Sequence, residues 1–316
     1  MSVNMKKKFL LPAMLLAAVF ASCNSEENPA QAESRAALGV NVQLQEMSRA
    51  GMVSDQALPD DDPIGVSLVA ADYSDYDDKT AGYINIAYKG TTTGTKQTWD
   101  PVTAGTQILL SGTSGVAYAY YPYTSTVTDY QSIPVDIAEQ KDWMWSGESD
   151  PVNDAEPNVS FNLKHAQTAV NVNVVRDASY TGEGEIKNLS VTSDGLASTG
   201  KLSAVDGKFV DVNGAGTAVV IANDFTLDGT TLTSQENPYM FIPASAEKKN
   251  FLVSAVIDGK AYNVGVTMNE AFQPGYIYKI AVKISNIGLT IDSVVIVEKW
   301  QEQSLPEGTL KPGTGA

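Results

Sequence analysis

Short runs in which apolar and polar residues alternate, separated by turn residues, recur along most of this chain. Leu38 to Leu44 and Ala169 to Val175 are examples, and their two-residue period is typical of half-buried β-strands. We find no segment with the sustained 3.6-residue period of an amphipathic helix. The pattern therefore predicts an all-β chain of short strands.

Three Asp-Gly pairs stand between such runs, at Asp206-Gly207, Asp228-Gly229 and Asp258-Gly259. Both positions of a two-residue hairpin turn favour positive φ, which Asp and Gly tolerate, so we expect three tight hairpins. Further apolar runs predict strands over residues 64–69, 83–88, 107–110, 115–123, 159–165 and 276–284.

A stretch rich in Asp, Glu, Pro and Asn at 148–158 marks a change of composition, and we expect a domain boundary there. The sequence thus predicts two sandwich-like domains in tandem, over 38–158 and 159–300. The first begins with a lead strand at 38–46, and a Pro- and Gly-containing tail at 301–316 follows the second.

The N-terminus has the pattern of an export signal. Lysines at 6–8 precede an apolar run over 9–20, which is short of the roughly 20 residues that span a bilayer as a helix. Small residues then lead to Cys23, as in a bacterial lipobox. We expect residues 1–22 to be a lipoprotein signal peptide and Cys23 to carry the lipid; ordinary cleavage beside a chance cysteine is the alternative. Residues 23–37 are expected to form a flexible acidic tether of the kind that directs lipoproteins of Bacteroidetes-type bacteria to the cell surface.

Composition argues against several classes of function. The formal net charge of -16 disfavours binding to nucleic acid. One Cys and one His exclude a disulfide within the chain and argue strongly against a Cys-His metal site or a Cys-His catalytic pair. A Ser-His-Asp triad would need His165, for which a structural role in a strand is favoured. Enzyme activity and a cofactor are therefore not expected.

Two groups of residues suggest other ligands. Aspartates at 60–62 and at 72, 75, 77 and 78 have oxygens suited to calcium, but neither run fits a calcium-binding loop, which favours solvated acidic loops. Clustered aromatic residues suggest either sugar stacking or, as is more common, a sandwich core. These residues are Tyr118, Tyr120, Tyr121, Tyr123, Trp143 and Trp145.

Several motifs occur in an order that resembles the fimbrillin-like proteins, subunits of lipoprotein-derived pili of Bacteroidales. They are the lipobox, a lead strand ending near Arg49, Asp142-Trp-Met-Trp145, Phe161-Asn-Leu-Lys-His165, Tyr239-Met-Phe-Ile-Pro243, Pro274-Gly-Tyr-Ile-Tyr278 and Ile296-Val-Glu-Lys-Trp300. The resemblance implies two transthyretin-like β-sandwich domains, export as a lipoprotein, and an outer-membrane precursor that assembles into extracellular fimbriae. Its implied partners are the lipoprotein export machinery, an Arg-specific protease and other fimbrial subunits.

The resemblance also implies roles for particular residues. Cleavage after Arg49 would make Ala50 the new N-terminus and remove the lead strand, whereas cleavage at Arg35 would leave that strand in place. The donor strand would run from Leu289 to Trp300 and include Ile291, Val294 and Ile296. The resulting hypothesis is a pilin polymerised by donor-strand exchange that supports adhesion to a surface ligand not specified by the sequence. The alternatives are a pilus anchor or tip subunit, or a monomeric glycan-binding lipoprotein on the cell surface.

Overall fold

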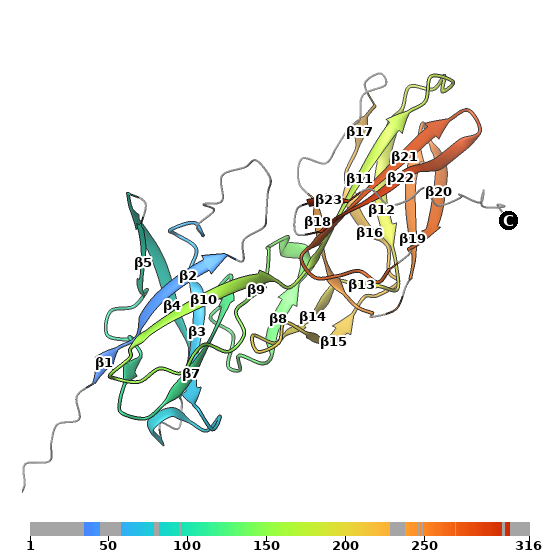
Figure 1. The fold of residues 1–316 in the computed structure, drawn as a ribbon. Helices are drawn as coiled ribbons and strands as arrows, with labels where there is room; N and C mark the ends of the chain where they lie inside the picture. Colours follow the sequence, from blue (N-terminus) through green and yellow to red (C-terminus); the bar gives the residue numbers. More distant parts are fainter. Residues whose placement is uncertain are drawn as a thin grey trace, which may run out of the picture. The chain divides into compact units, whose positions relative to one another are not determined.

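The computed structural model describes residues 35–44, 58–78, 82–94, 96–227, 238–245, 247, 249–268, 270–298 and 301–303. Its regular elements are β-strands and two short 3-10 helices, η1 (Tyr76–Asp78) and η2 (Ile137–Glu139) (Figure 1). The prediction of an all-β chain is confirmed. A helix with the length and hydropathy to cross a membrane is not found in the described part of the chain.

The N-terminal half forms a closed barrel with the strand order β10-β2-β5-β4-β3-β7-β9. Strands β1 (Ala36–Ala37) and β6 (Leu109–Leu110) form a separate 2-stranded antiparallel sheet. The barrel strands are β2 (Gly39–Leu44), β3 (Ile64–Ala70), β4 (Tyr83–Thr93), β5 (Lys96–Pro101), β7 (Gly115–Tyr121), β9 (Met144–Trp145) and β10 (Asn158–His165).

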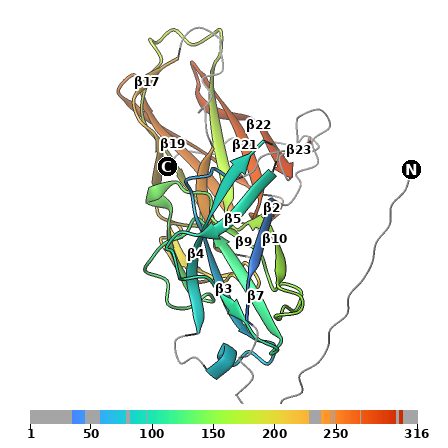
Figure 2. The ribbon, with the colours of Figure 1, turned by 90° about the vertical axis from the view of Figure 1, so that its left-hand side faces the viewer.

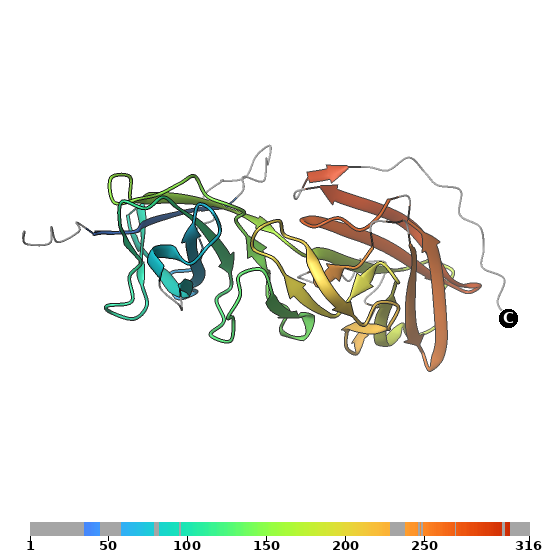
Figure 3. The same cartoon turned by 90° about the horizontal axis from the view of Figure 1, so that it is seen from below.

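The C-terminal half contains a 6-stranded sheet, β13-β18-β11-β21-β22-β23, and a 5-stranded sheet in which β16, β12, β19 and β20 follow one another and β17 pairs with β12. Their bounds are β11 (Thr168–Arg176), β12 (Glu185–Thr192), β13 (Leu196–Ala197), β16 (Val219–Ala222), β17 (Phe225–Thr226), β18 (Tyr239–Pro243), β19 (Asn250–Ile257), β20 (Lys260–Thr267), β21 (Tyr276–Ser285), β22 (Gly288–Glu298) and β23 (Gln301–Gln303). Figure 3 shows the last three of these strands in orange-red, following one another in space.

A 3-stranded sheet, β15-β14-β8, joins the halves of the sequence. It consists of β8 (Ile133–Asp136), β14 (Thr199–Leu202) and β15 (Phe209–Asn213). Antiparallel pairing of β8 with β14 means that a strand before the expected boundary at 148–158 is bonded to one after it. Conversely β10, which we expected to open the second domain, pairs with β2 and β9 in the barrel. The division into two domains at 158/159 remains a prediction.

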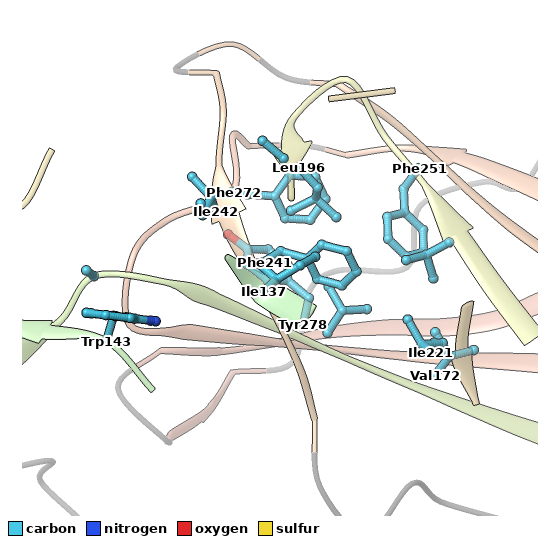
Figure 4. Close-up of a cluster of buried hydrophobic side chains, with 14 of the residues drawn as sticks. Ile137, Trp143, Val172, Leu196, Ile221, Phe241, Ile242, Phe251, Phe272 and Tyr278 are labelled. Carbon is cyan, nitrogen blue, oxygen red and sulfur yellow. The ribbon is translucent and has the colours of Figure 1, made fainter. Parts of the chain in front are cut away.

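Two large hydrophobic cores hold these sheets, beside a small third cluster of Ala169 and Ile277. The barrel core includes Val66, Phe161 and Leu163. The second core lies between the C-terminal sheets, where Phe241, Phe272 and Tyr278 gather (Figure 4), and the rings of Phe272 and Tyr278 meet edge to face at 4.8 Å. Tyr118 and Tyr120 of β7 belong to this second core, whereas the alternate residues of β7 face the barrel interior. Strands β3 and β7 are therefore buried on both faces.

The hairpin predictions have different outcomes. Asp258 and Gly259 both adopt positive φ, at 48° and 76°, and connect β19 to β20 as expected. In the Asp206-Gly207 pair, only Gly207 has positive φ. Strands β14 and β15 do pair antiparallel, but β14 ends at Leu202 and β15 begins at Phe209, so a longer loop replaces the tight turn that we expected. Residues 228–229 lie outside the described residues.

Candidate functional site: the lead strand in the barrel

The lead strand β2 lies between β10 and β5 in the barrel wall. It runs parallel to β10 from the Gly39–Asn158 pair to the Leu44–Leu163 pair, as Figures 1 and 2 show for the blue and green strands. On its other side it is antiparallel to β5, and the described residues give one pair there, Val40 with Trp99. Strand β2 is thus bound along its length to one neighbour and at a single point to the other.

The alternation that predicted this strand has its expected structural consequence. Leu38 is 5% exposed, and Val40, Val42 and Leu44 are half-buried against the barrel core. Asn41 and Gln43 are exposed. The strand therefore covers part of the barrel core with one face, and a barrel without it would expose those apolar contacts.

The lead segment, by which we mean residues 35–44, has a second set of contacts at its start, outside the ladder with β10. Ala36 and Ala37 form β1 and pair with β6, and the Leu38 amide donates to the Ile108 carbonyl at 2.9 Å. Arg35 forms an ion pair with Asp77 at 3.5 Å. The expected flexible tether over 23–37 is thus ordered at its last residues, because backbone pairing and opposite charge hold them.

The residues expected to carry the lipid and the cleavage site, Cys23, Arg49 and Ala50, lie outside the described residues, as does Trp300. The expected donor segment from Leu289 lies in β22. That strand is antiparallel to β21 from Gly288–Ser285 to Glu298–Tyr276, a register that includes Ile291, Val294 and Ile296. Leu289 is 9% exposed and belongs to the chain's own core. In this structure the segment is thus paired within its own chain.

The acidic loops are held by protein contacts. Asp60 accepts hydrogen bonds from the Thr92 hydroxyl and amide and from Gln97, and the Thr92 hydroxyl contact is the main reason that the pKa of Asp60 is lowered. Asp72 caps the turn at Ser74 in the same way. Among the described residues, no group of three or more acidic, His or Cys side chains has a geometry that could hold a metal ion.

His165 faces Asp142, with its Nδ1 atom 2.9 Å from one carboxylate oxygen and 2.8 Å from the other. It ends β10, where it pairs with Met144 of β9. The structure therefore gives the imidazole a partner at the junction of β9 and β10, in agreement with the structural role favoured from sequence.

The aromatic cluster is mainly core. Tyr118 and Tyr120 are 1% exposed and Trp143 is 4% exposed; Tyr118 stacks on Tyr130 at 4.6 Å, and Tyr120 lies parallel to Trp143. Trp145 is half-buried under the Lys164 ammonium, 4.8 Å from its ring centroid. These rings do not form a flat exposed platform on which a sugar would stack.

A polar cleft of about 710 Å³ lies between β8, β14, β15 and the loop after β7. Its charged groups are largely committed to one another. Lys141 pairs with Glu139 at 2.7 Å, and Lys201 pairs with Asp211 at 2.9 Å. No specific feature of this cleft favours one class of ligand.

Comparison with known proteins agrees with this architecture. A family model described as fimbrillin-like matches residues 48–300, which is most of the chain. A "putative cell adhesion protein" from Bacteroides uniformis ATCC 8492 has a similar structure, with TM-score 0.57 and 20% identity, over 84% of this chain and 98% of that one. Another of the same description, from Bacteroides ovatus ATCC 8483, has TM-score 0.58 and 18% identity, over 87% of this chain and 100% of that one. No curated protein matches the sequence.

The fold and the family match define a structural protein rather than an enzyme. The chain belongs to the fimbrillin-like family. The resemblance seen in the sequence motifs is thereby confirmed, whereas the similar structures, at these identities, show a shared fold alone.

Sequence reasoning missed two features of the site. The partner of the lead strand along its whole length is β10, a parallel neighbour far away in the sequence. The ion pair between Arg35 and Asp77 was also not foreseen. The only sequence signals were an arginine just before the lead strand and an aspartate-rich loop, and neither specifies the other.

Proposed function

We propose that this chain is a structural subunit of cell-surface fimbriae that supports adhesion. It is exported as a lipoprotein through Cys23 and is cut after Arg49, so that the lead strand leaves the barrel. A strand from another subunit then fills the place of β2 between β10 and β5. The observation that carries this proposal is the lead strand itself, an apolar-faced strand held in the barrel wall and connected to β3 through residues 45–63.

The energetics of exchange are balanced. The ladder with β10 supplies hydrogen bonds that each contribute a net ~1 kcal/mol, and burial of Leu38 contributes roughly 1.5–3 kcal/mol. A replacement strand with alternating apolar residues would form similar hydrogen bonds with β10 and bury similar side chains in the place of β2. While β2 is covalently attached, its high effective concentration favours it over any incoming strand. A cut between β2 and β3 removes that advantage.

The arginines of the chain support the choice of cleavage site. They stand at 35, 49 and 176. Arg35 is ion-paired at the start of β1, and Arg176 donates to the carbonyls of Tyr180 and Glu183 at the end of β11. Proteases act on segments that can extend into their active sites, and these two arginines are engaged in folded structure. Arg49 lies in the segment that connects the lead strand to β3.

The donor we propose is the segment Leu289 to Trp300, including Ile291, Val294 and Ile296. In the monomer this segment pairs with β21, so donation requires it to exchange one ladder for another. The two ladders are chemically alike, so the exchange can be nearly neutral in hydrogen bonding. The tail after residue 303 is the alternative source of a donor strand.

The test is digestion of the chain from Asn24 onward with an Arg-specific protease, followed by mass spectrometry and native gels. The expected result is a cut after Arg49 and then a ladder of oligomers. Arg49→Lys keeps the charge but resists the protease, so it should stay monomeric. If the Arg49→Lys chain forms the same ladder, cleavage does not control assembly and the proposal is wrong.

The donor is tested separately by adding a peptide of residues 288–303 during digestion. It should occupy the open barrel and stop the ladder, whereas the same peptide with Val294→Asp and Ile296→Asp should not. A deletion of 304–316 leaves every described strand in place; loss of the ladder on that deletion alone would transfer the donor role to the tail. For the lipid, Cys23→Ser in the full chain should abolish incorporation of labelled fatty acid.

A further inference from the structure

The lead segment contacts the rest of the chain at two separate places. Strand β2 is bound to β10 in the barrel wall, and residues 35–38 are bound outside that ladder. The second contact consists of the pairing of Ala36 and Ala37 with β6, the Leu38 amide on the Ile108 carbonyl, and the ion pair of Arg35 with Asp77. We call residues 35–38 with their receiving groups the N-terminal latch.

The Asp77 carboxylate is a shielded partner for Arg35. Its side chain is 11% exposed, against 34% for Arg35. One carboxylate oxygen, Oδ1, accepts a hydrogen bond from the Ser111 hydroxyl at 2.7 Å. The other, Oδ2, is buried, accepts no hydrogen bond among the described residues, and is the oxygen that faces Arg35. Removal of Arg35 would leave this charge shielded from water without that partner, which is costly for a buried carboxylate.

The receiving side of the latch is rigid. Strand β6 is fixed to β4 by two tyrosines, because the Leu109 amide donates to the Tyr83 hydroxyl and the Ile108 amide to the Tyr88 hydroxyl, each at 3.2 Å. Next to it, the Ser111 amide donates to the Tyr76 hydroxyl at 3.0 Å. Asp77 is the next residue after Tyr76 in η1, so the carboxylate is presented from an anchored position.

From these contacts we propose that Asp77 and β6 retain the lead strand on the barrel after the chain is cut, so that cleavage and release are separate steps. The inference rests on the proposed function in one respect, namely that release of this strand is what permits assembly. A cut between β2 and β3 frees the C-terminal end of the lead segment only. Two linked contacts behave as a bivalent ligand, because each holds the other at high effective concentration. The strand therefore leaves only when the latch and the ladder open together.

The test uses a nick that does not depend on Arg49. In the chain from Asn24 onward, a recognition site for a sequence-specific protease is inserted within residues 45–57, and Ser25→Cys supplies the sole thiol for a fluorescent label. After nicking, release of the labelled segment is followed by anisotropy in the presence of excess unlabelled peptide of residues 35–48. Thermal denaturation before nicking confirms that each variant is folded.

Asp77→Asn keeps an oxygen for Ser111 but removes the charge, and should speed release about tenfold. Asp75→Asn makes the same charge change in the same loop and should release like the parent chain. Arg35→Gln should match Asp77→Asn without altering the barrel, and the double variant should be no faster than either single one. Equal release rates for the parent, Asp77→Asn and Arg35→Gln chains would overturn the latch.

The outcome separates this inference from the function on which it rests. If release follows the expected order but the released barrels form no oligomers, the latch stands and strand exchange is wrong. If the barrels form oligomers at a rate that Asp77→Asn does not change, exchange stands and the latch does not control it.

Discussion

The half-buried face of the lead strand can be tested by placing one charge on either side of it. Val42 lies opposite Phe161 in the register with β10 and packs against the barrel core, whereas its neighbour Gln43 is exposed. Val42→Asp and Gln43→Asp change the net charge of the chain in the same direction. They differ in the face on which the carboxylate is placed.

The structure gives the expected magnitudes. Loss of a half-buried valine costs about 1 kcal/mol, half of the value for full burial. Turning a carboxylate toward the core adds about 1–3 kcal/mol. Val42→Asp should therefore lower the free energy of unfolding of the barrel by about 2–4 kcal/mol. The loss cannot exceed the free energy with which β2 docks, because beyond that point the strand detaches and the rest of the barrel stays folded. Gln43→Asp should stay within about 0.5 kcal/mol of the parent.

Urea denaturation followed by circular dichroism gives both free energies. A second reading is the susceptibility of residues 35–48 to a nonspecific protease, which should rise for Val42→Asp alone if the strand detaches. Equal stability and equal proteolysis of the two variants would refute the assignment of Val42 to the core face, and with it the argument that removal of β2 exposes an apolar groove.

Three other predictions concern the framework around the site. Tyr120→Phe removes a buried hydroxyl that lies 2.7 Å from an asparagine oxygen, and should cost about 2 kcal/mol in urea denaturation; Tyr121→Phe, whose hydroxyl meets an exposed aspartate, should cost less than half of that. Gly207→Ala should lower the melting temperature more than Gly259→Ala. Both have positive φ, but a Cβ at Gly207 would lie 2.1 Å from an indole carbon, whereas at Gly259 nothing lies within 4 Å. Burial raises the pKa of Tyr278 from 10.0 to about 12, so the folded state favours the neutral phenol. The stability that this preference contributes is complete below pH 10 and is lost as the pH rises through 12. Tyr278→Phe should therefore flatten the stability profile between pH 10 and 12, as measured by urea denaturation at each pH.

Local features of the fold were predictable because their causes lie within a few residues. The alternation from Leu38 to Leu44 gives the strand and its buried face. The Asp258-Gly259 turn gives its hairpin, because both residues take the positive φ that the turn requires. Where a longer loop can form, as beside Gly207, the same dipeptide does not fix the end of the strand.

Pairing between distant segments was not predictable from such signals. Any alternating strand satisfies the pattern needed beside β2, so the sequence does not specify β10 among the candidates. The same limit applies to Trp143, for which the sequence favoured a core position but left a sugar-stacking surface open. Trp143 is buried in a core that also contains Tyr120 of β7, whose ring lies parallel to it. Likewise, the pairing of Arg35 with Asp77 depends on β6 and η1 being brought together by the barrel.

The topology of the barrel bears on the proposed removal of its first strand. In a barrel built only of consecutive hairpins, a cut between the first two strands would leave them bonded to each other. Here β3 pairs with β4 and β7, and β2 pairs with β10 and β5, so β2 and β3 are not ladder neighbours. A cut between them therefore divides no hairpin, and β3 keeps both of its own ladders. What the cut changes is the effective concentration of β2, which then depends on its ladder with β10 and on the contacts of Arg35 to Leu38.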